Sequence, residues 1–171
     1  MRSYFVFLIC SALFAENVAG LKWTPPAGWK SSGTTLMRAA TYPVAPVPGD
    51  RKGAECVVYF FGPGQGGTVQ ANIDRWQGQF KGPGGKPAAA KVNKITLHGL
   101  ATTTIDVSGD YSGMGGPTSA APVVSAYRLL GAIIEGPSGN VFIKFTGPAK
   151  TMAANQPNFQ QLLDSFQKAD K

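Results

Sequence analysis

The stretch YRLLGAIIEGPSGNVFIKFTG, residues 127–147, joins two apolar runs through a short segment rich in turn-forming residues. The runs 123–135 and 141–147 contain many β-branched and aromatic residues, which favour strands. Because only the segment GPSGN separates them, we expect the two runs to pair as an antiparallel hairpin. This hairpin indicates that the protein is built around a β-sheet.

Further strands are expected on the N-terminal side of this hairpin. The segment AECVVYFF, residues 54–61, is apolar on both faces, which is typical of a central strand covered on both sides. The segment 35–44 is a candidate strand beside it, and residues 91–109 predict two strands that turn at His98 and Gly99. Consecutive strands joined by short turns indicate an antiparallel sheet.

Two amphipathic helices are expected to cover this sheet. Apolar residues recur at spacings of three and four at Val69, Ile73, Trp76 and Phe80, and again at Phe159, Leu162, Leu163 and Phe166. Pro148 is expected to start the second helical stretch, and Pro157 to interrupt or restart it. The predicted fold class is therefore α+β, with an antiparallel sheet of about five to six strands covered by two main helices.

The N-terminal segment MRSYFVFLICSALFAENVAG has the pattern of a secretory signal peptide. It carries Arg2, then an apolar run, then small residues that suit a signal peptidase. We expect residues 1–20 to be a signal peptide cleaved after Gly20, and residues 21–171 to form a single α+β domain. The apolar run is shorter than the ~20 residues of a membrane-spanning helix, so no transmembrane helix is expected in the mature chain. The expected location is periplasmic or extracellular.

Cleavage after Gly20 would leave Cys56 as the only cysteine. Cys10 lies in the predicted signal, so no disulfide within the mature chain is expected. Since Cys56 lies in the apolar run CVVYFF, we interpret it as a buried structural thiol. The chain carries a net charge of +7, and this charge favours acidic partners. No motif for specific nucleic-acid binding is present.

Gly62, Gly64 and Gly67 form a G-x-G-x-x-G pattern between an expected strand and an expected helix. A dinucleotide site of this kind needs an acidic residue about 20 positions further on, and none is present there. The Lys and Ser or Thr of a triphosphate-binding loop are also missing after Gly67. We therefore expect these glycines to serve the reversal of the chain into the helix, and we expect no cofactor.

Catalytic and metal-binding patterns are weak in this sequence. His98 is the only histidine, which excludes motifs with several histidines, and no metal site is expected. Cys56, His98 and Asp106 supply the residue types of a catalytic triad, although their spacing does not favour one. A hydrolase or other enzyme that uses the region of Cys56 and His98 stays open as the alternative function.

The glycine-rich segment 108–118, SGDYSGMGGPT, is expected to be a loop that ends the preceding strand. It presents Asp110, Tyr111 and Met114 among four glycines. A carboxylate, an aromatic ring and a flexible thioether on a loop can adapt to a partner. These three residues are the predicted ligand-binding residues, and the competing interpretation is a connection whose Tyr111 folds onto the core.

Several segments together resemble a group of uncharacterised exported bacterial proteins, and their order resembles the PsbP-like fold. The resemblance covers nearly all of residues 22–167, and it rests on WTPPAGW, GPGQGGTVQANIDRWQGQF, VSGDYSGMGGP, YRLLGAIIEGPSGNVFIKFTGP and FQQLLDSF. It implies an antiparallel sheet between helices, an α/β/α sandwich, but no functional residue is carried over. The expected function is that of an exported, non-enzymatic accessory or binding protein whose partner is a protein or an anionic ligand of the cell envelope.

Overall fold

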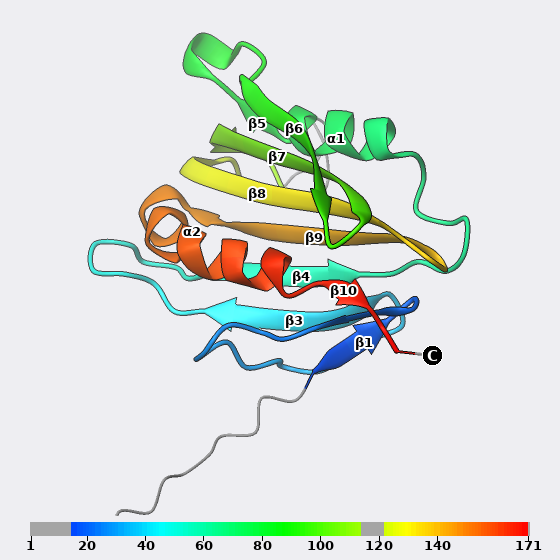
Figure 1. The fold of residues 1–171 in the computed structure, drawn as a ribbon. Coiled ribbons are helices and arrows are strands. Elements are labelled where there is room, and N and C mark those ends of the chain that lie inside the picture. The colour runs from blue at the N-terminus through cyan, green and yellow to red at the C-terminus, as the bar shows by residue number, and fades with distance from the viewer. Residues whose placement is uncertain (1–14, 114–121, 171) are drawn as a thin grey trace, which may run out of the picture.

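The protein forms an antiparallel main sheet, seen in a computed structural model that describes residues 15–113 and 122–170. The strand order is β3-β4-β9-β8-β7-β5, and β6 also pairs with β7 (Figure 1). The strands are β3 (Arg38–Val44), β4 (Ala54–Tyr59), β5 (Phe80–Lys81), β6 (Ala90–Leu97), β7 (Leu100–Tyr111), β8 (Val124–Gly136) and β9 (Gly139–Pro148).

The predicted hairpin of β8 and β9 is confirmed and lies at the centre of the sheet. Its strands pair from Tyr127 and Pro148 down to the turn between Gly136 and Gly139. The hairpin of β6 and β7 also turns at His98 and Gly99, as predicted. Both turn residues have positive φ, 45° and 77°, which is the requirement of the tight turn that suits twisted strands.

The two predicted helices pack on opposite faces of the sheet. Helix α2 (Ala149–Asp164) buries Met152, Leu162 and Leu163 in one core cluster, and α1 (Val69–Gly78) buries Ile73 and Trp76 in the other. Figure 1 shows α2 crossing in front of the sheet. The predicted α+β class and the arrangement of a sheet between helices are therefore confirmed.

The main sheet has seven strands in the described residues, where five to six were expected. The additional strand is β5, a two-residue strand in a segment expected to be part helix and part loop. A short 3-10 turn, η1 (Pro83–Gly85), follows it. Phe80 pairs with Tyr111, and Lys81 pairs with Asp110. Two residues are too few to show the alternating pattern of a strand.

The prediction that Pro157 interrupts the C-terminal helix is wrong. Helix α2 is continuous from Ala149 to Asp164 with Pro157 inside it. Proline costs the helix one backbone hydrogen bond. Since residues on both sides of it, Met152 and Phe159, are buried against the sheet, packing offsets that loss.

A second, three-stranded sheet brings the two ends of the described chain together. It consists of β1 (Glu16–Val18), β2 (Leu21–Trp23) and β10 (Gln167–Lys168), with β2 in the middle. Trp23 stacks on Phe166 with ring centroids 4.9 Å apart. The β1 strand precedes the cleavage point expected after Gly20, which stays a prediction.

Within the described residues, no helix is long and apolar enough to cross a membrane.

Candidate functional site

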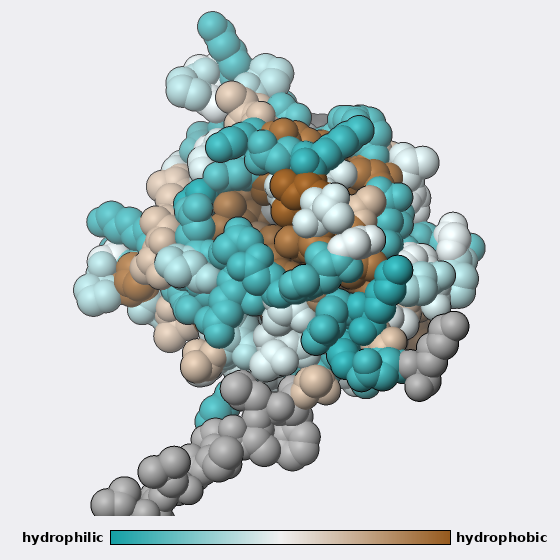
Figure 2. Space-filling model, viewed as in Figure 1, coloured by the Kyte–Doolittle hydropathy of each residue, from teal (hydrophilic) through white to brown (hydrophobic). Residues whose placement is uncertain are grey.

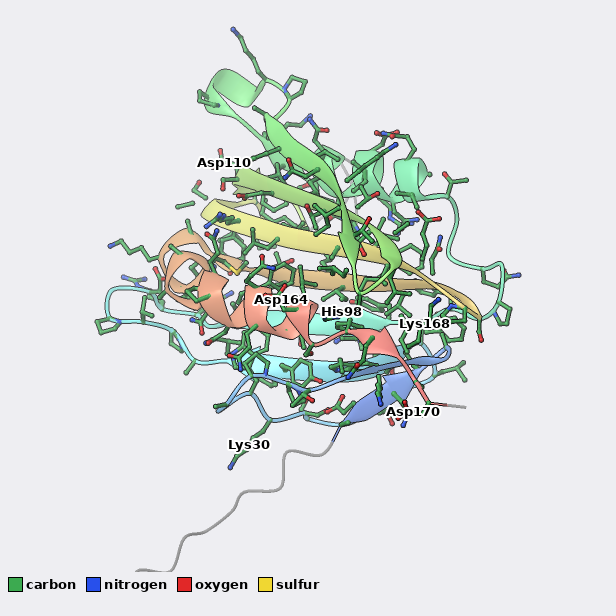
Figure 3. The ribbon with its side chains drawn as sticks, in the orientation of Figure 1. Lys30, His98, Asp110, Asp164, Lys168 and Asp170 are labelled. Atoms are coloured by element: carbon green, nitrogen blue, oxygen red, sulfur yellow. The ribbon has the colours of Figure 1, made fainter. Side chains whose placement is uncertain are left out.

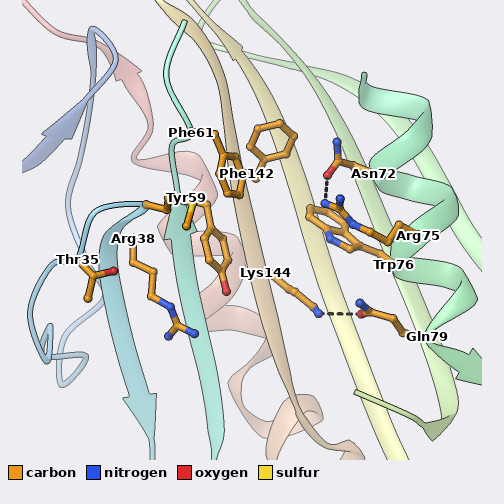
Figure 4. Close-up of a pocket in the computed structure, with 11 residues that line it drawn as sticks. Thr35, Arg38, Tyr59, Phe61, Asn72, Arg75, Trp76, Gln79, Phe142 and Lys144 are labelled. Carbon is orange, nitrogen blue, oxygen red and sulfur yellow. Dashed lines mark hydrogen bonds between the residues drawn. The ribbon is translucent and has the colours of Figure 1, made fainter. Parts of the chain in front are cut away.

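A cleft of about 430 Å³ opens on the α1 face of the sheet, between α1 and the start of β3 (Figure 4). The floor is formed by β4 and β9, and Thr35 and Met37 stand at the β3 side. Aromatic and cationic side chains dominate its lining: Tyr59, Phe61, Trp76 and Phe142, and Arg38, Arg75 and Lys144. This combination suits a ligand that has both an apolar part and a negative charge.

The aromatic side chains pack on one another, and this packing restricts the movement of the side chains at the floor of the cleft. The rings of Tyr59 and Phe61 stack at 5.8 Å, and Phe61 meets Phe142 edge-on at 5.5 Å. Gly66 makes room for this group, because a Cβ there would lie within 2.9 Å of both phenylalanine rings. The apolar part of the cleft is therefore preformed.

Trp76 of α1 reaches the sheet because position 131 on β8 is a glycine. A Cβ at Gly131 would lie 2.6 Å from the indole ring of Trp76, which is closer than real Cβ contacts. Trp76 itself is only 4% exposed. The glycine thus decides how closely the helix approaches the floor of the cleft.

The glycines before α1 adopt the conformations that the chain reversal needs, as expected. Gly62, Gly64, Gly66 and Gly67 all have positive φ. Thr68 then caps the helix, and its hydroxyl accepts a hydrogen bond from the backbone N–H of Ala71 at 3.2 Å. The loop and cap together aim the first turn of α1 at the cleft.

Asn72, in this first turn, is buried and holds Arg75 in place. Its side-chain nitrogen donates to the carbonyl oxygens of Gly66 at 2.8 Å and Thr68 at 2.9 Å. The guanidinium of Arg75 donates to the side-chain oxygen of Asn72 (Figure 4). Arg75 is therefore positioned along the cleft wall by an amide, with no carboxylate in this contact to neutralise it.

Arg38 lies on the β3 side of the cleft. Its guanidinium donates to the carboxylate of Glu55 at 3.2 Å and lies 5.6 Å from the ring centroid of Tyr59. Since both side chains of this ion pair are partly exposed, the pair contributes little to stability. The aromatic contact nevertheless directs the cation toward the cleft.

Lys144, on the central strand β9, is the most unusual side chain of the cleft, because it is a lysine that is only 6% exposed. Its ammonium donates to the side-chain oxygen of Gln79 at 2.8 Å and to the hydroxyl of Tyr111 at 3.4 Å. Among the described residues it forms no salt bridge. Burial, with a smaller contribution from the charge of Arg75, lowers the pKa of Lys144 to about 8.

The predicted ligand-binding residues Asp110, Tyr111 and Met114 do not form one described group. Met114 lies outside the described residues. Asp110 and Tyr111 belong to β7, so the prediction that the strand ends before them is wrong. Both residues pair with β5, and Tyr111 also pairs with Val124 of β8. A Cβ at Gly109 would lie 2.2 Å from the Lys81 carbonyl, so glycine there permits this close approach.

Tyr111 packs onto the core and also touches the site. Its ring lies between those of Phe80, at 4.9 Å, and Tyr127, at 5.6 Å. Its hydroxyl meets Lys144, and burial raises its pKa. Asp110 is exposed and pairs with β5, so of the two described residues only Tyr111 reaches Lys144.

The structure does not join Cys56 and His98. Cys56, on β4, is fully buried on the α2 face, and burial raises the pKa of its thiol well above the usual range. His98 lies at the β6–β7 turn, at the opposite end of β7 from Asp110 (Figure 3), and its Nδ1 is 2.9 Å from the carbonyl oxygen of Phe166. Asp106 is bound by Arg128 at 2.7 and 2.8 Å. This placement gives no support to catalysis by these residues.

A second hollow lies on the α2 face. Figure 2 shows apolar surface there, surrounded by hydrophilic residues. A pocket of about 470 Å³ on this face lies between β6, β7 and α2. It contains Lys91 and Lys94, but it lacks a buried charged group, so it is the weaker candidate.

Sequence reasoning missed Lys144, Arg75 and Gln79. One signal was available for Lys144, since it is the single charge in the strand segment VFIKFTG, whose other residues favour burial. Arg75 and Gln79 carry no such signal, because polar residues on an amphipathic helix usually face solvent. Among the described residues, no group of three His, Cys, Asp or Glu side chains is placed to hold a metal ion.

This architecture is the PsbP-like fold, as the comparison with solved structures shows. The solution structure of CyanoP, the cyanobacterial PsbP of Synechocystis sp. PCC 6803, matches with a TM-score of 0.51 and 8% identity, covering 91% of both chains. PA94 of Pseudomonas aeruginosa, a protein of unknown function with a suggested regulatory role, matches with a TM-score of 0.52 and 14% identity, covering 92% of this chain and 98% of its own. No family model and no curated protein matches the sequence. At these identities the likeness concerns the fold alone.

Proposed function

We propose that this protein is an exported, non-enzymatic binding protein that takes a small anion carrying an apolar or aromatic group in the α1 cleft. The observation that carries this proposal is the burial of Lys144 in a cleft that two guanidiniums, Arg38 and Arg75, and several aromatic rings also line. A buried cation without a carboxylate partner is costly. An anionic ligand would supply the missing negative charge, and the rings of Tyr59, Trp76 and Phe142 would contact its apolar part.

The proposal of export is based on the N-terminal sequence pattern. The contacts of β1 help to place the cleavage point. The hydroxyl of Tyr42 donates to the carboxylate of Glu16 at 2.8 Å and accepts from Trp23 at 2.8 Å. A cut after Gly20 would remove Glu16 and all of β1. We therefore place the start of the mature chain at or before Glu16, since that start keeps the small sheet complete.

The binding proposal is tested by titration calorimetry with 4-methylbenzoate and its neutral counterpart 4-methylbenzamide. The carboxylate is expected to bind with a dissociation constant below about 1 mM, and the amide at least about tenfold more weakly, a difference of about 1.4 kcal/mol. Arg75→Gln is expected to weaken the carboxylate to a similar degree. Lys150→Met, which removes an exposed charge from the first turn of α2 on the opposite face, is the matched control and should not change binding.

Equal affinity for the carboxylate and the amide, or no binding of either, would contradict the proposal. The alternative function, an enzyme that uses the region of Cys56 and His98, has no supporting contact in the described residues. It predicts an accessible thiol, and the alkylation experiment in the Discussion tests that property.

A further inference from the structure

The position of the Lys144 amine suits a reaction with a ligand as well as the attraction of an anion. It lines the α1 cleft together with Arg38 and Tyr59, and the same three residues line an adjoining hollow of about 180 Å³. Its two hydrogen-bond partners, Gln79 and Tyr111, are both neutral. A lysine held in this way is not fixed in its ammonium form by a carboxylate.

We propose that Lys144 captures a carbonyl compound that carries a negative charge, such as an aldehyde with a carboxylate, as a reversible imine. This inference rests on the proposed function, because the same cleft holds the charged end of the ligand. It adds a covalent bond to that binding and names the reactive class of ligand. The guanidinium of Arg75, along the cleft wall, is the group placed to hold the carboxylate.

The bond changes of this capture need no oxidant or reductant. The lone pair of the neutral Nζ adds to the carbonyl carbon and forms a carbinolamine. The former carbonyl oxygen then leaves as water, and a C=N double bond remains between the ligand and Nζ. The imine nitrogen takes up a proton from solvent, and hydrolysis by water reverses every step. The Tyr111 hydroxyl, 3.4 Å from Nζ, is the group placed to assist the proton transfers.

The surroundings of Lys144 keep its amine deprotonated in part of the molecules near physiological pH. The titratable and charged groups that share its two hollows are Arg38, Glu55, Tyr59, Arg75 and Tyr111. Glu55 is paired with Arg38. With a pKa of about 8, roughly a quarter of the Lys144 amine is neutral at pH 7.5, against about one part in a thousand for an ordinary lysine. Desolvated lysines beside another cation are a recognised class of imine-forming nucleophile.

A second feature of the adjoining hollow is consistent with an occupant. The hydroxyl of Thr146, two residues along β9 from Lys144, is buried and has no hydrogen-bond partner among the described residues. It lines the hollow that Lys144 also lines. Buried polar groups are normally paired, and a turn of the Thr146 side chain toward the hollow would bring its hydroxyl within reach of a ligand oxygen there.

The test uses the full folded protein with 4-formylbenzoate and sodium cyanoborohydride at pH 7.5, followed by intact mass and peptide mapping. We expect one N-(4-carboxybenzyl) group per chain, located at Lys144 and formed at least about tenfold faster than at any other lysine. Benzaldehyde, which lacks the carboxylate, should label Lys144 more slowly. Lys144→Arg should abolish the fast labelling, and Lys150→Met should leave it unchanged. Labelling spread over surface lysines, with Lys144 no faster, would overturn the inference.

Experiments on the wild-type protein alone can distinguish the two proposals, which are anion binding in the α1 cleft and imine formation at Lys144. An excess of 4-methylbenzoate, which has no aldehyde, should protect Lys144 from labelling. Binding of 4-methylbenzoate without labelling of Lys144 would disprove imine formation and leave the binding function intact. Equally fast labelling by benzaldehyde and 4-formylbenzoate, without any binding of 4-methylbenzoate, would overturn both the anionic ligand and its capture.

Discussion

The ammonium of Lys144 on β9 donates a hydrogen bond to the side-chain oxygen of Gln79, at the end of α1, over 2.8 Å. Both side chains are buried, so this bond ties the central strand to the helix that covers it. The two bonds use two of the three donors of the ammonium, and both acceptors, Gln79 and Tyr111, are neutral.

The first prediction concerns the pH dependence of stability in the Lys144→Met variant. The folded protein lowers the pKa of Lys144 from 10.5 to about 8, so between these values the unfolded chain binds the extra proton. Wild-type stability therefore gains from this group as pH rises from 8 to 10.5. We expect the stability of the variant relative to wild type to fall by about 2–3 kcal/mol between pH 7 and 10.5, measured by urea unfolding.

The matched control for this experiment is Lys150→Met, which removes an exposed lysine on α2. Its stability relative to wild type should stay constant over the same pH range. A constant difference for Lys144→Met as well would show that the amine is not desolvated in the folded protein.

The second prediction concerns Gly131, beneath Trp76. Gly131→Ala should destabilise the protein by about 1–3 kcal/mol, because the new methyl group overlaps the indole ring and must displace it. The displaced Trp76 should also weaken 4-methylbenzoate binding. Gly78→Ala is the control, since nothing lies within 4 Å of a Cβ there and alanine favours the helix. Thermal unfolding measures the stability of both variants. Equal losses of stability in the two would contradict the steric explanation.

The third prediction concerns Pro157. Replacing it by Ala should stabilise the protein by about 1–3 kcal/mol, because the exposed position regains a backbone hydrogen bond within a helix that is already continuous. Chemical unfolding of the variant measures the gain. A loss of stability would indicate that the proline ring makes a contact which the helix needs.

The fourth prediction concerns the start of the mature chain. A chain that begins at Glu16 should be more stable than one that begins at Leu21 by about 1–3 kcal/mol, because only the longer chain keeps β1 and the bond from Tyr42 to Glu16. N-terminal sequencing of exported protein should show a start at or before residue 16. Export with a start at Leu21, and equal stability of the two chains, would restore the boundary predicted after Gly20.

The fifth prediction concerns the thiol of Cys56. It is fully buried and its pKa is raised, so iodoacetamide at pH 7.5 should leave it unmodified in the folded protein and alkylate it after unfolding in urea. Fast alkylation of folded protein would revive the alternative of an enzyme that uses this cysteine.

Periodicity in the sequence was sufficient to predict the β8–β9 hairpin, the turn at His98 and both amphipathic helices. These elements are set by local patterns: β-branched residues in runs of strand length, and apolar residues at helical spacing. The loop before α1 was also predictable. The acidic residue of a nucleotide site is missing from the sequence, so the glycines at positions 62, 64 and 67 were expected to serve the reversal of the chain.

Tertiary structure alone decided the site, because its residues come from distant parts of the chain. Lys144 becomes a desolvated amine only when α1 brings Gln79 and Arg75 to the cleft that it lines. Tyr111 becomes its partner only when pairing with β5 and β8 extends β7 to that residue. Pro157 likewise stays within a helix because Met152 and Phe159, which come before and after it in the sequence, pack in the core. Burial and electrostatic environment depend on contacts between elements far apart in sequence, whereas the elements themselves follow from neighbours within a few residues.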